Sequence, residues 1–166
     1  MTVYPLVKSS IIDLRTATNH SKHVATGFFI KPDIIVTASH AVLKTGTTIP
    51  EDRIIAVYYR DGSANSVELS LIGSDIVNDL AVLKSPISLS PLSWGSSRDT
   101  AIGEKIYAIG DLLNEDPRAL CTGFVRDNKM TLTTDPMAVE LLDLDMSIGG
   151  VYPVVLSSMN LVGLSV

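Results

Sequence analysis

Short apolar runs separated by turn residues recur along the chain, and this pattern constrains the fold more than any other feature of the sequence. The runs are rich in Val, Ile, Leu and Thr, residue types that suit extended, half-buried backbone. Turns such as KPD, RDGSAN, RDNK and SSMN separate several of them. Strands are predicted over residues 4–14, 24–30, 33–39, 53–59, 67–74, 80–85, 105–110, 119–127, 129–134, 151–157 and 161–166. We therefore predict an all-β fold with about the strand number of two small barrels.

Composition indicates a compact protein with much inward-facing apolar surface. Hydrophobic residues make up 46% of the 166 positions, charged residues make up 19%, and the mean hydropathy is +0.31. A disordered chain would be more polar and more highly charged. The net charge of -5 is modest, and Lys and Arg are scattered along the chain. We therefore expect neither nucleic acid nor a membrane surface as a partner.

Two further features bear on where the protein works. No apolar stretch reaches the length needed to cross a bilayer, and the start MTVYPLVKSS lacks the basic and apolar segments of an export signal. The single cysteine, Cys121, excludes an internal disulfide and fits a reducing compartment. We expect a soluble cytoplasmic protein, although a processed or trimmed secreted chain would look the same.

A stretch rich in proline and serine, SPISLSPLSWGSS at residues 85–97, is the best candidate for a linker. Pro86 and Pro91 would interrupt strand ladders, so a crossover between two halves fits here. We predict an N-terminal barrel over residues 1–90 and a C-terminal barrel over residues 91–166. Within the first half, HAVLK, residues 40–44, could open a single helical turn, but it is too short to define a helix by its period.

Two residues that are distant in the sequence are of types that acid–base catalysis uses. His40 lies among small and apolar side chains in VTASHAV, and Asp79 precedes a predicted strand in NDLAVLK. Taken singly, the histidine would be a core residue and the aspartate a turn residue. Taken together, they fit a pair in which an imidazole accepts a proton from a serine hydroxyl and a carboxylate fixes the ring tautomer. Only a closed β fold could bring them within hydrogen-bond reach.

Four segments, in the right order, resemble chymotrypsin-like serine proteases, especially the cysteine-poor trypsin-like branch that includes the HtrA/Deg peptidases. GFFIKPDIIVTASHAV resembles the family segment that ends in T-A-A-H, and NDLAVLK resembles D-L-A-V-L-K. GEKIYAIGD and TGFV resemble strands of the family's second barrel. The resemblance implies a chymotrypsin-like double β-barrel with the cleft between its halves, in which His40 is the general base and Asp79 orients it.

The nucleophile region departs from the family pattern. The family has G-x-S-G-G-P, and the corresponding region here is LLDLDMSIGGVYPVVLSSMNLVGL, residues 141–164. In one register, Met146 and Ser147 match the residue before the nucleophile and the nucleophile itself. Ile148 is then an insertion, and Gly149 and Gly150 follow one position late.

A second register competes with the first. Counting back without gaps from Pro153 places Gly150 at the serine position, which leaves no hydroxyl. Ser147 would then be an ordinary loop serine. Even in the first register, Asp145 replaces a glycine whose N–H normally faces the developing oxyanion. Losing one oxyanion donor costs about 3 kcal/mol of transition-state stabilisation, on the order of a hundredfold in rate.

The same region carries a hint of specificity and a second departure. Leu141 occupies the position that in this family often forms the floor of the specificity pocket, which implies an apolar side chain before the scissile bond. The chain ends at Val166, before a strand with which the family pairs substrate and completes the second barrel. The second barrel is therefore expected to be incomplete, with an edge open to strand addition.

The remaining candidates are assigned ordinary roles. His20 and His23, in TNHSKH, are expected to be solvated loop residues because no cysteine or carboxylate accompanies them as a metal ligand. Cys121 lies in a predicted strand and is expected to pack there. We predict a trypsin-like serine endopeptidase that acts on a polypeptide without metal or cofactor. The alternative is an inactive pseudoprotease that binds peptides or serves in assembly. The sequence does not predict the oligomeric state.

Overall fold

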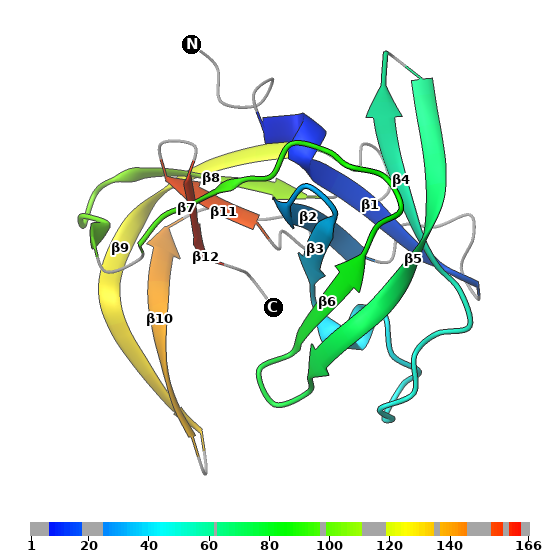
Figure 1. Cartoon of the computed structure of the whole chain (residues 1–166). Coiled ribbons are helices and arrows are strands. Elements are labelled where there is room, and N and C mark those ends of the chain that lie inside the picture. The colour runs from blue at the N-terminus through cyan, green and yellow to red at the C-terminus, as the bar shows by residue number, and fades with distance from the viewer. Residues whose placement is uncertain are drawn as a thin grey trace.

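A computed structural model describes residues 7–17, 25–61, 63–96, 99–110, 119–134, 137–145, 154–157 and 160–163. Its strands form a closed barrel and a separate six-stranded sheet (Figure 1). The barrel strands are β1 (Ile11–Thr16), β2 (Ala25–Lys31), β3 (Ile34–Thr37), β4 (Ile54–Arg60), β5 (Ser63–Asp75) and β6 (Leu80–Lys84). The sheet strands are β7 (Ser93–Trp94), β8 (Lys105–Gly110), β9 (Ala119–Thr134), β10 (Met137–Asp145), β11 (Val154–Ser157) and β12 (Asn160–Gly163). The all-β prediction is confirmed.

The barrel closes in the order β1-β2-β3-β6-β5-β4. Its strands alternate between two environments because successive side chains of a strand point to opposite faces. Phe29 and Ile35 belong to the core inside the barrel, whereas their neighbours Phe28 and Val36 belong to a second buried cluster. That second cluster also contains Ile109 of β8, so it joins the barrel to the sheet. Both cores therefore come from the short apolar runs of the sequence.

Gly27 of β2 is a place where the barrel core leaves no room for a side chain. A Cβ there would lie 3.0 Å from a methyl of Ile35 and 3.2 Å from one of Leu14. We expect Gly27→Ala to lower the free energy of unfolding by about 1–3 kcal/mol through overpacking, as measured by urea denaturation. Gly73→Ala is the matched control, because a Cβ at Gly73 meets nothing within 4 Å. Equal stability of the two variants would contradict the tight packing.

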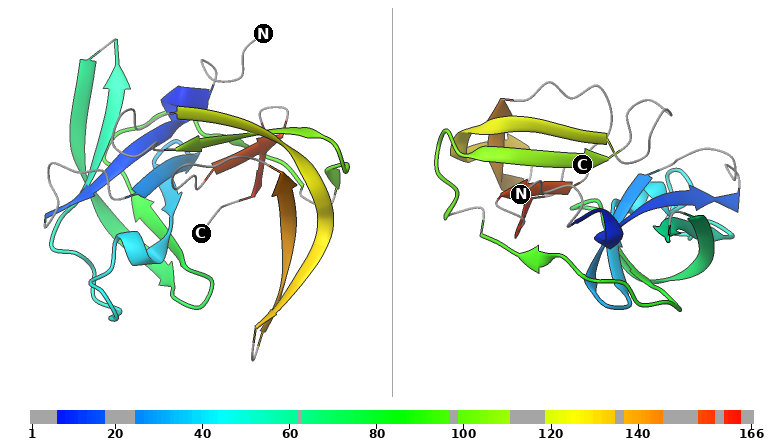
Figure 2. Two further views of the ribbon diagram at one scale, coloured as in Figure 1. Left: turned by 180° about the vertical axis from the view of Figure 1, so that it is seen from behind. Right: turned by 90° about the horizontal axis from the view of Figure 1, so that it is seen from above.

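The sheet follows the order β10-β9-β8-β11-β12-β7, so β10 and β7 are its two edges. The segment after β6 leads away from the barrel to β7, which pairs in parallel with β12 through Ser93 and Asn160 (Figure 2). The crossover predicted over residues 85–97 thus contains a short strand. β9 and β10 form a long curved hairpin that extends from the sheet (Figure 1).

Three sequence expectations differ from the observed elements. A strand was expected over residues 4–14, but residues 8–10 of that range form a 3-10 turn, η1 (Lys8–Ser10), and β1 begins only at Ile11. RDNK, residues 126–129, lies inside β9 and is not a turn between strands. Residues 141–145, the start of the region assigned to the nucleophile loop, belong to the strand β10. The single helical turn expected at the start of HAVLK is present as η3 (Ser39–Ala41).

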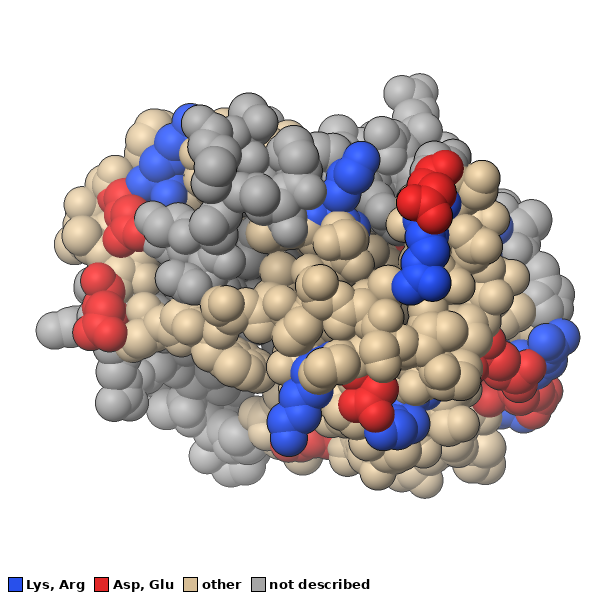
Figure 3. All heavy atoms as spheres, turned by 45° about the horizontal axis from the view of Figure 1, so that its top comes forward, with Lys and Arg blue, Asp and Glu red and all other residues tan. Residues whose placement is uncertain are grey.

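Charged side chains on the face drawn in Figure 3 lie mostly beside charges of the opposite sign. Ion pairs on the barrel include Lys44 with Asp52 at 2.7 Å and Arg53 with Glu68 at 3.0 Å. Exposed pairs of this kind contribute little to stability. Within the described part of the chain, no helix has the length and apolar character that a membrane span requires.

Candidate active site

The strand pairing of the barrel brings His40 and Asp79 together. β3 and β6 are antiparallel neighbours, and Thr37 at the end of β3 pairs with Ala81 of β6. Ser39 lies two residues after Thr37, and Asp79 lies two residues before Ala81. The backbone N–H of Ser39 donates to the carbonyl of Asp79 at 3.1 Å. The next residue is His40, so the register itself carries the histidine to the aspartate. Their separation in the sequence is spanned by β4, β5 and the loops beside them.

The turn η3 presents the imidazole to solvent. Its flanking residues Ser39, Ala41 and Val42 are all buried, and the latter two belong to the barrel core. His40 is the exception, because 65% of its side chain is exposed. The small and apolar residues of VTASHAV therefore anchor the turn, and the histidine is the one side chain that it directs outward.

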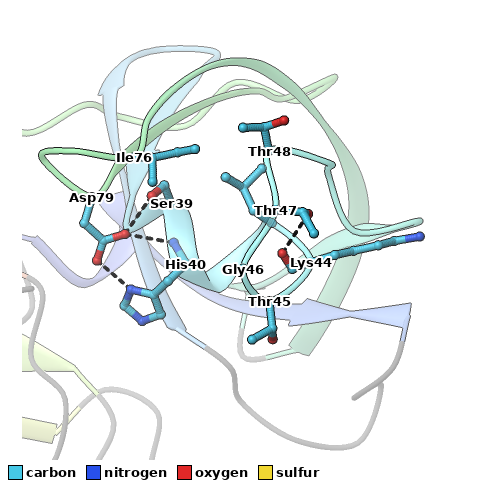
Figure 4. A pocket seen from close by; sticks show the side chains of 10 residues that line it. Ser39, His40, Lys44, Thr45, Gly46, Thr47, Thr48, Ile76 and Asp79 are labelled. Atoms are coloured by element: carbon cyan, nitrogen blue, oxygen red, sulfur yellow. Dashed lines mark hydrogen bonds and ion pairs between the residues drawn. The ribbon is translucent and has the colours of Figure 1, made fainter.

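The carboxylate of Asp79 accepts three hydrogen bonds from two consecutive residues (Figure 4). Oδ1 accepts from the Ser39 hydroxyl at 2.7 Å and from the His40 backbone N–H at 2.8 Å. Oδ2 lies 2.5 Å from Nδ1 of the His40 ring. The ring nitrogen that remains, Nε2, is on the opposite side of the imidazole. This arrangement leaves one nitrogen available to exchange a proton with another group.

The backbone of Asp79 adopts a conformation that few residues accept. Its φ is 53°, in the left-handed region, which aspartate tolerates better than most non-glycine residues. The turn before it is held by Asp75, whose carboxylate accepts from the backbone N–H of Asn78 at 3.1 Å and from its side-chain amide at 2.6 Å. Two sets of hydrogen bonds, one on each side, thus fix the position of the Asp79 carboxylate.

Hydrogen bonding outweighs burial in setting the charge state of Asp79. Partial burial raises the pKa of this carboxyl, but the donors on Ser39 and His40 more than offset burial and hold the pKa below its usual value of 3.8. The carboxylate is therefore ionised at neutral pH. The ionised carboxylate can therefore accept a hydrogen bond from a proton on Nδ1 of His40.

This pKa shift predicts a pH-dependent contribution to stability. A carboxyl with a lowered pKa in the folded state stabilises the fold above its unfolded value of 3.8, and this contribution is lost as the pH falls through the folded-state pKa. We expect the stability difference between wild type and Asp79→Asn to be fully present above about pH 5 and to shrink as the pH falls below 3.8. Urea denaturation at a series of pH values measures it. A difference that stays constant down to about pH 2 would contradict the shift.

A pocket of about 700 Å³ lies beside the pair (Figure 4). His40, Ser39 and Asp79 form one side of it, and the loop of residues 43–48 and Ile76 form the rest. The Thr47 hydroxyl fixes this loop, because it donates to the Lys44 carbonyl at 2.8 Å and accepts from the Ile49 N–H at 3.0 Å. Apart from Asp79 and from Lys44, which pairs with Asp52, the lining residues place hydroxyl and apolar groups next to the imidazole.

The other predicted site residues are located as follows. Leu141 lies in β10 and pairs with Met130 of β9, and Asp145 is exposed at the end of β10 and pairs with Phe124. Cys121 is half-buried in β9. His20, His23, Met146, Ser147, Gly149 and Gly150 lie outside the described residues. Among the residues that are described, no group of three His, Cys, Asp or Glu side chains is arranged to hold a metal ion.

Comparison with known proteins identifies the fold family. The family model for the trypsin-like peptidase domain matches residues 25–164, which is most of the chain. The chain belongs to the trypsin-like peptidase domain family. The resemblance seen in the sequence is therefore confirmed at the level of the family. A comparison with curated proteins gives no significant match.

Two solved structures show how this trypsin-like domain compares in three dimensions. The crystal structure of Deg5 matches with a TM-score of 0.74 and 23% identity, covering 98% of this chain and 81% of Deg5. The protease domain of MamO from Magnetospirillum magneticum, in its apo form, matches with a TM-score of 0.72 and 17% identity, covering 95% and 84%. At these identities the matches establish the fold, which is the predicted chymotrypsin-like one.

Proposed function

We propose that this trypsin-like domain is a serine endopeptidase that hydrolyses peptide bonds with His40, Asp79 and Ser147. The observation that carries the proposal is the hydrogen bond between the Asp79 carboxylate and Nδ1 of His40. It is supported by the exposure of the ring, by the adjacent pocket and by membership of the peptidase family. The role of Ser147 rests on its position in the sequence pattern alone.

The mechanism follows from the tautomer that Asp79 selects. The Nδ1–H group donates a hydrogen bond to the carboxylate and keeps its proton, so Nε2 carries a lone pair. Nε2 accepts the proton of the Ser147 hydroxyl as the serine oxygen attacks the peptide carbonyl. The imidazolium that forms is stabilised by the ionised Asp79. It then returns the proton to the leaving amine, and the acyl-enzyme is hydrolysed by a water that His40 activates in the same way.

The oxyanion site is proposed to be weaker than in the family pattern. Backbone N–H groups around residues 145–147, with Gly149 and Gly150, would supply the donors. Asp145 stands where the family has glycine, and its carboxylate opposes the negative charge that develops on the carbonyl oxygen. We therefore propose slow turnover. An apolar preference before the scissile bond, through Leu141, belongs to the same proposal.

A fluorophosphonate probe tests the proposal directly, because it reacts with serines that a neighbouring base activates. Peptide mapping of the labelled full chain is expected to place the probe on Ser147. Ser147→Ala should abolish labelling. Ser66→Ala is the control, because Ser66 is exposed on β5 and does not line the pocket. Label on another serine would assign the nucleophile elsewhere and overturn this triad.

A second candidate function is favoured by Asp145 itself. The carboxylate in place of the oxyanion glycine suits a pseudoprotease, which keeps the fold and the pocket but binds peptides without cleaving them. Folded protein that takes no label, under conditions in which an active trypsin-like protease reacts, would support this reading. Retained binding of an uncleaved peptide library would complete the case.

A further inference from the structure

The hydroxyl of Ser39 is placed on the back of the Asp79 carboxylate. Ser39 is 2% exposed, and its Oγ donates to Asp79 Oδ1 at 2.7 Å. This contact lies on the opposite oxygen from the one that meets the histidine ring. The sequence pattern gave no reason to single out Ser39, since it was merely one of the small residues before the histidine.

Packing alone does not explain a serine at this position. Ala38 and Ala41, close by in the same segment, show that small apolar side chains suit this turn. A buried hydroxyl is costly unless it is hydrogen-bonded, so a purely structural position would favour alanine. The Ser39 hydroxyl donates to a charged carboxylate, and hydrogen bonds to charged groups are the stronger kind.

The geometry indicates what this hydrogen bond does. Oδ1 has two donors, the Ser39 hydroxyl and the His40 N–H, which approach it from different atoms of the turn. Together they oppose rotation of the carboxylate about its Cβ–Cγ bond. Without the hydroxyl, one backbone donor would be left to hold Oδ1, and Oδ2 would be free to swing away from the ring. Asp79 also sits on a left-handed backbone, which makes its placement depend on such contacts.

We propose that Ser39 is a positioning residue that holds the Asp79 carboxylate in the plane in which it meets Nδ1 of His40. The proposal rests on the proposed peptidase function for its effect on turnover, but the effect on the ring is independent of turnover. The step it influences is the proton transfer through Nε2, since the carboxylate selects the tautomer that makes Nε2 an acceptor. The Ser39 hydroxyl bonds the carboxylate and not the ring, so its effect on the imidazole passes through Asp79.

Three substitutions isolate the hydroxyl. Ser39→Ala removes it, and the pair Ser39→Thr and Ser39→Val compares side chains of nearly equal size that differ in having or lacking the hydroxyl. Thr37→Val is the matched control, because the buried Thr37 hydroxyl donates to the Thr26 carbonyl at 3.0 Å and not to Asp79. It should lower stability without altering the pair.

The kinetic readout is the split between kcat and KM for a cleaved peptide. We expect Ser39→Ala and Ser39→Val to lower kcat by about tenfold with KM unchanged, and Ser39→Thr to retain most of the activity. Thr37→Val should keep the wild-type kcat. Equal kcat in the Thr and Val variants would overturn the proposal, and this comparison stands even if the Ala variant fails to fold.

The second readout is nitrogen NMR of the His40 ring, which reports the Nδ1–H tautomer without any substrate. Ser39→Ala and Ser39→Val are expected to reduce the Nδ1–H signal, and Thr37→Val to leave it unchanged. If the wild type neither cleaves peptides nor takes the probe, the peptidase function fails, and the NMR result alone decides the role of Ser39. A ring spectrum that is the same in all variants would overturn it.

Discussion

Asp79→Asn is expected to lower kcat for peptide hydrolysis by about 10⁴-fold while the protein stays folded. The reason lies in the donors around the carboxylate. The Oδ1 position receives two hydrogen bonds, from Ser39 and from the His40 backbone, so the amide oxygen of asparagine will take that position. The amide NH₂ then faces Nδ1 of the ring. Nδ1 becomes an acceptor, the proton moves to Nε2, and the ring can no longer act as the base.

Steady-state hydrolysis of a peptide substrate measures this loss, and circular dichroism checks the fold. Asp75→Asn is the comparison variant, because Asp75 is also a hydrogen-bonded aspartate of the same loop but does not contact the ring. It is expected to change kcat by less than about threefold. An Asp79→Asn variant within about tenfold of wild type would contradict the assignment of Asp79 as the orienting group.

His40→Ala is expected to have an effect at least as large, about 10⁴- to 10⁶-fold in kcat, together with loss of fluorophosphonate labelling. Among the described residues that line the pocket, Ser39 also bonds Asp79, but its hydroxyl cannot replace an imidazole as a base. The ring is mostly exposed and contributes little to the core, so the loss should be chemical and not structural. The free energy of unfolding is expected to change by no more than about 1 kcal/mol.

His20→Ala and His23→Ala are the controls for histidine removal in general, and both should retain activity. The double variant His40→Ala with Asp79→Asn adds a further check. Because the two residues act as a unit, the double variant should be no slower than His40→Ala alone. Labelling of His40→Ala at the wild-type rate would remove the general base from the mechanism.

Much of the fold was predictable because short apolar runs bounded by turn residues indicate strands. The alternation of inward and outward side chains along β1 to β6 follows from apolar runs whose neighbours are turn residues. A single helical turn was expected at the start of HAVLK, after the strand predicted over residues 33–39, and η3 lies there. These features depend on residues close together in the sequence, which is why pattern alone finds them.

The hairpin of β9 and β10 was missed for an identifiable physical reason. Asp127 and Asn128 belong to the residue types that tolerate unusual backbone, and they were interpreted as a turn. In the fold the strand continues, and its pairing with β10 shifts register at this point, between Leu141 and Asp143 and again between Asp143 and Leu144. The extra residues on β9 are accommodated by bulges. Local sequence does not distinguish a turn from a bulge, because the partner strand decides.

The candidate site divides in the same way. His40 and Asp79 were found because each lies in a motif, and the two motifs occur together. Ser39 and the pocket loop carry no such signal, since a serine before a histidine and a threonine-rich loop are both commonplace. Their roles arise from the register between β3 and β6, which sequence pattern does not specify. Once the register is known, Ser39 is the residue that faces Asp79 across the two strands.

The closed barrel has a consequence for how this domain tolerates sequence change. Among the described residues, the hydrogen bonds that set the imidazole come from η3 and from the turn before β6, both within the barrel. Substitutions in the six-stranded sheet therefore leave the proton-handling residues undisturbed. Under the proposed triad, substitutions in the C-terminal half, which carries the nucleophile, can lower or restore turnover. The N-terminal barrel meanwhile keeps the pair of His40 and Asp79.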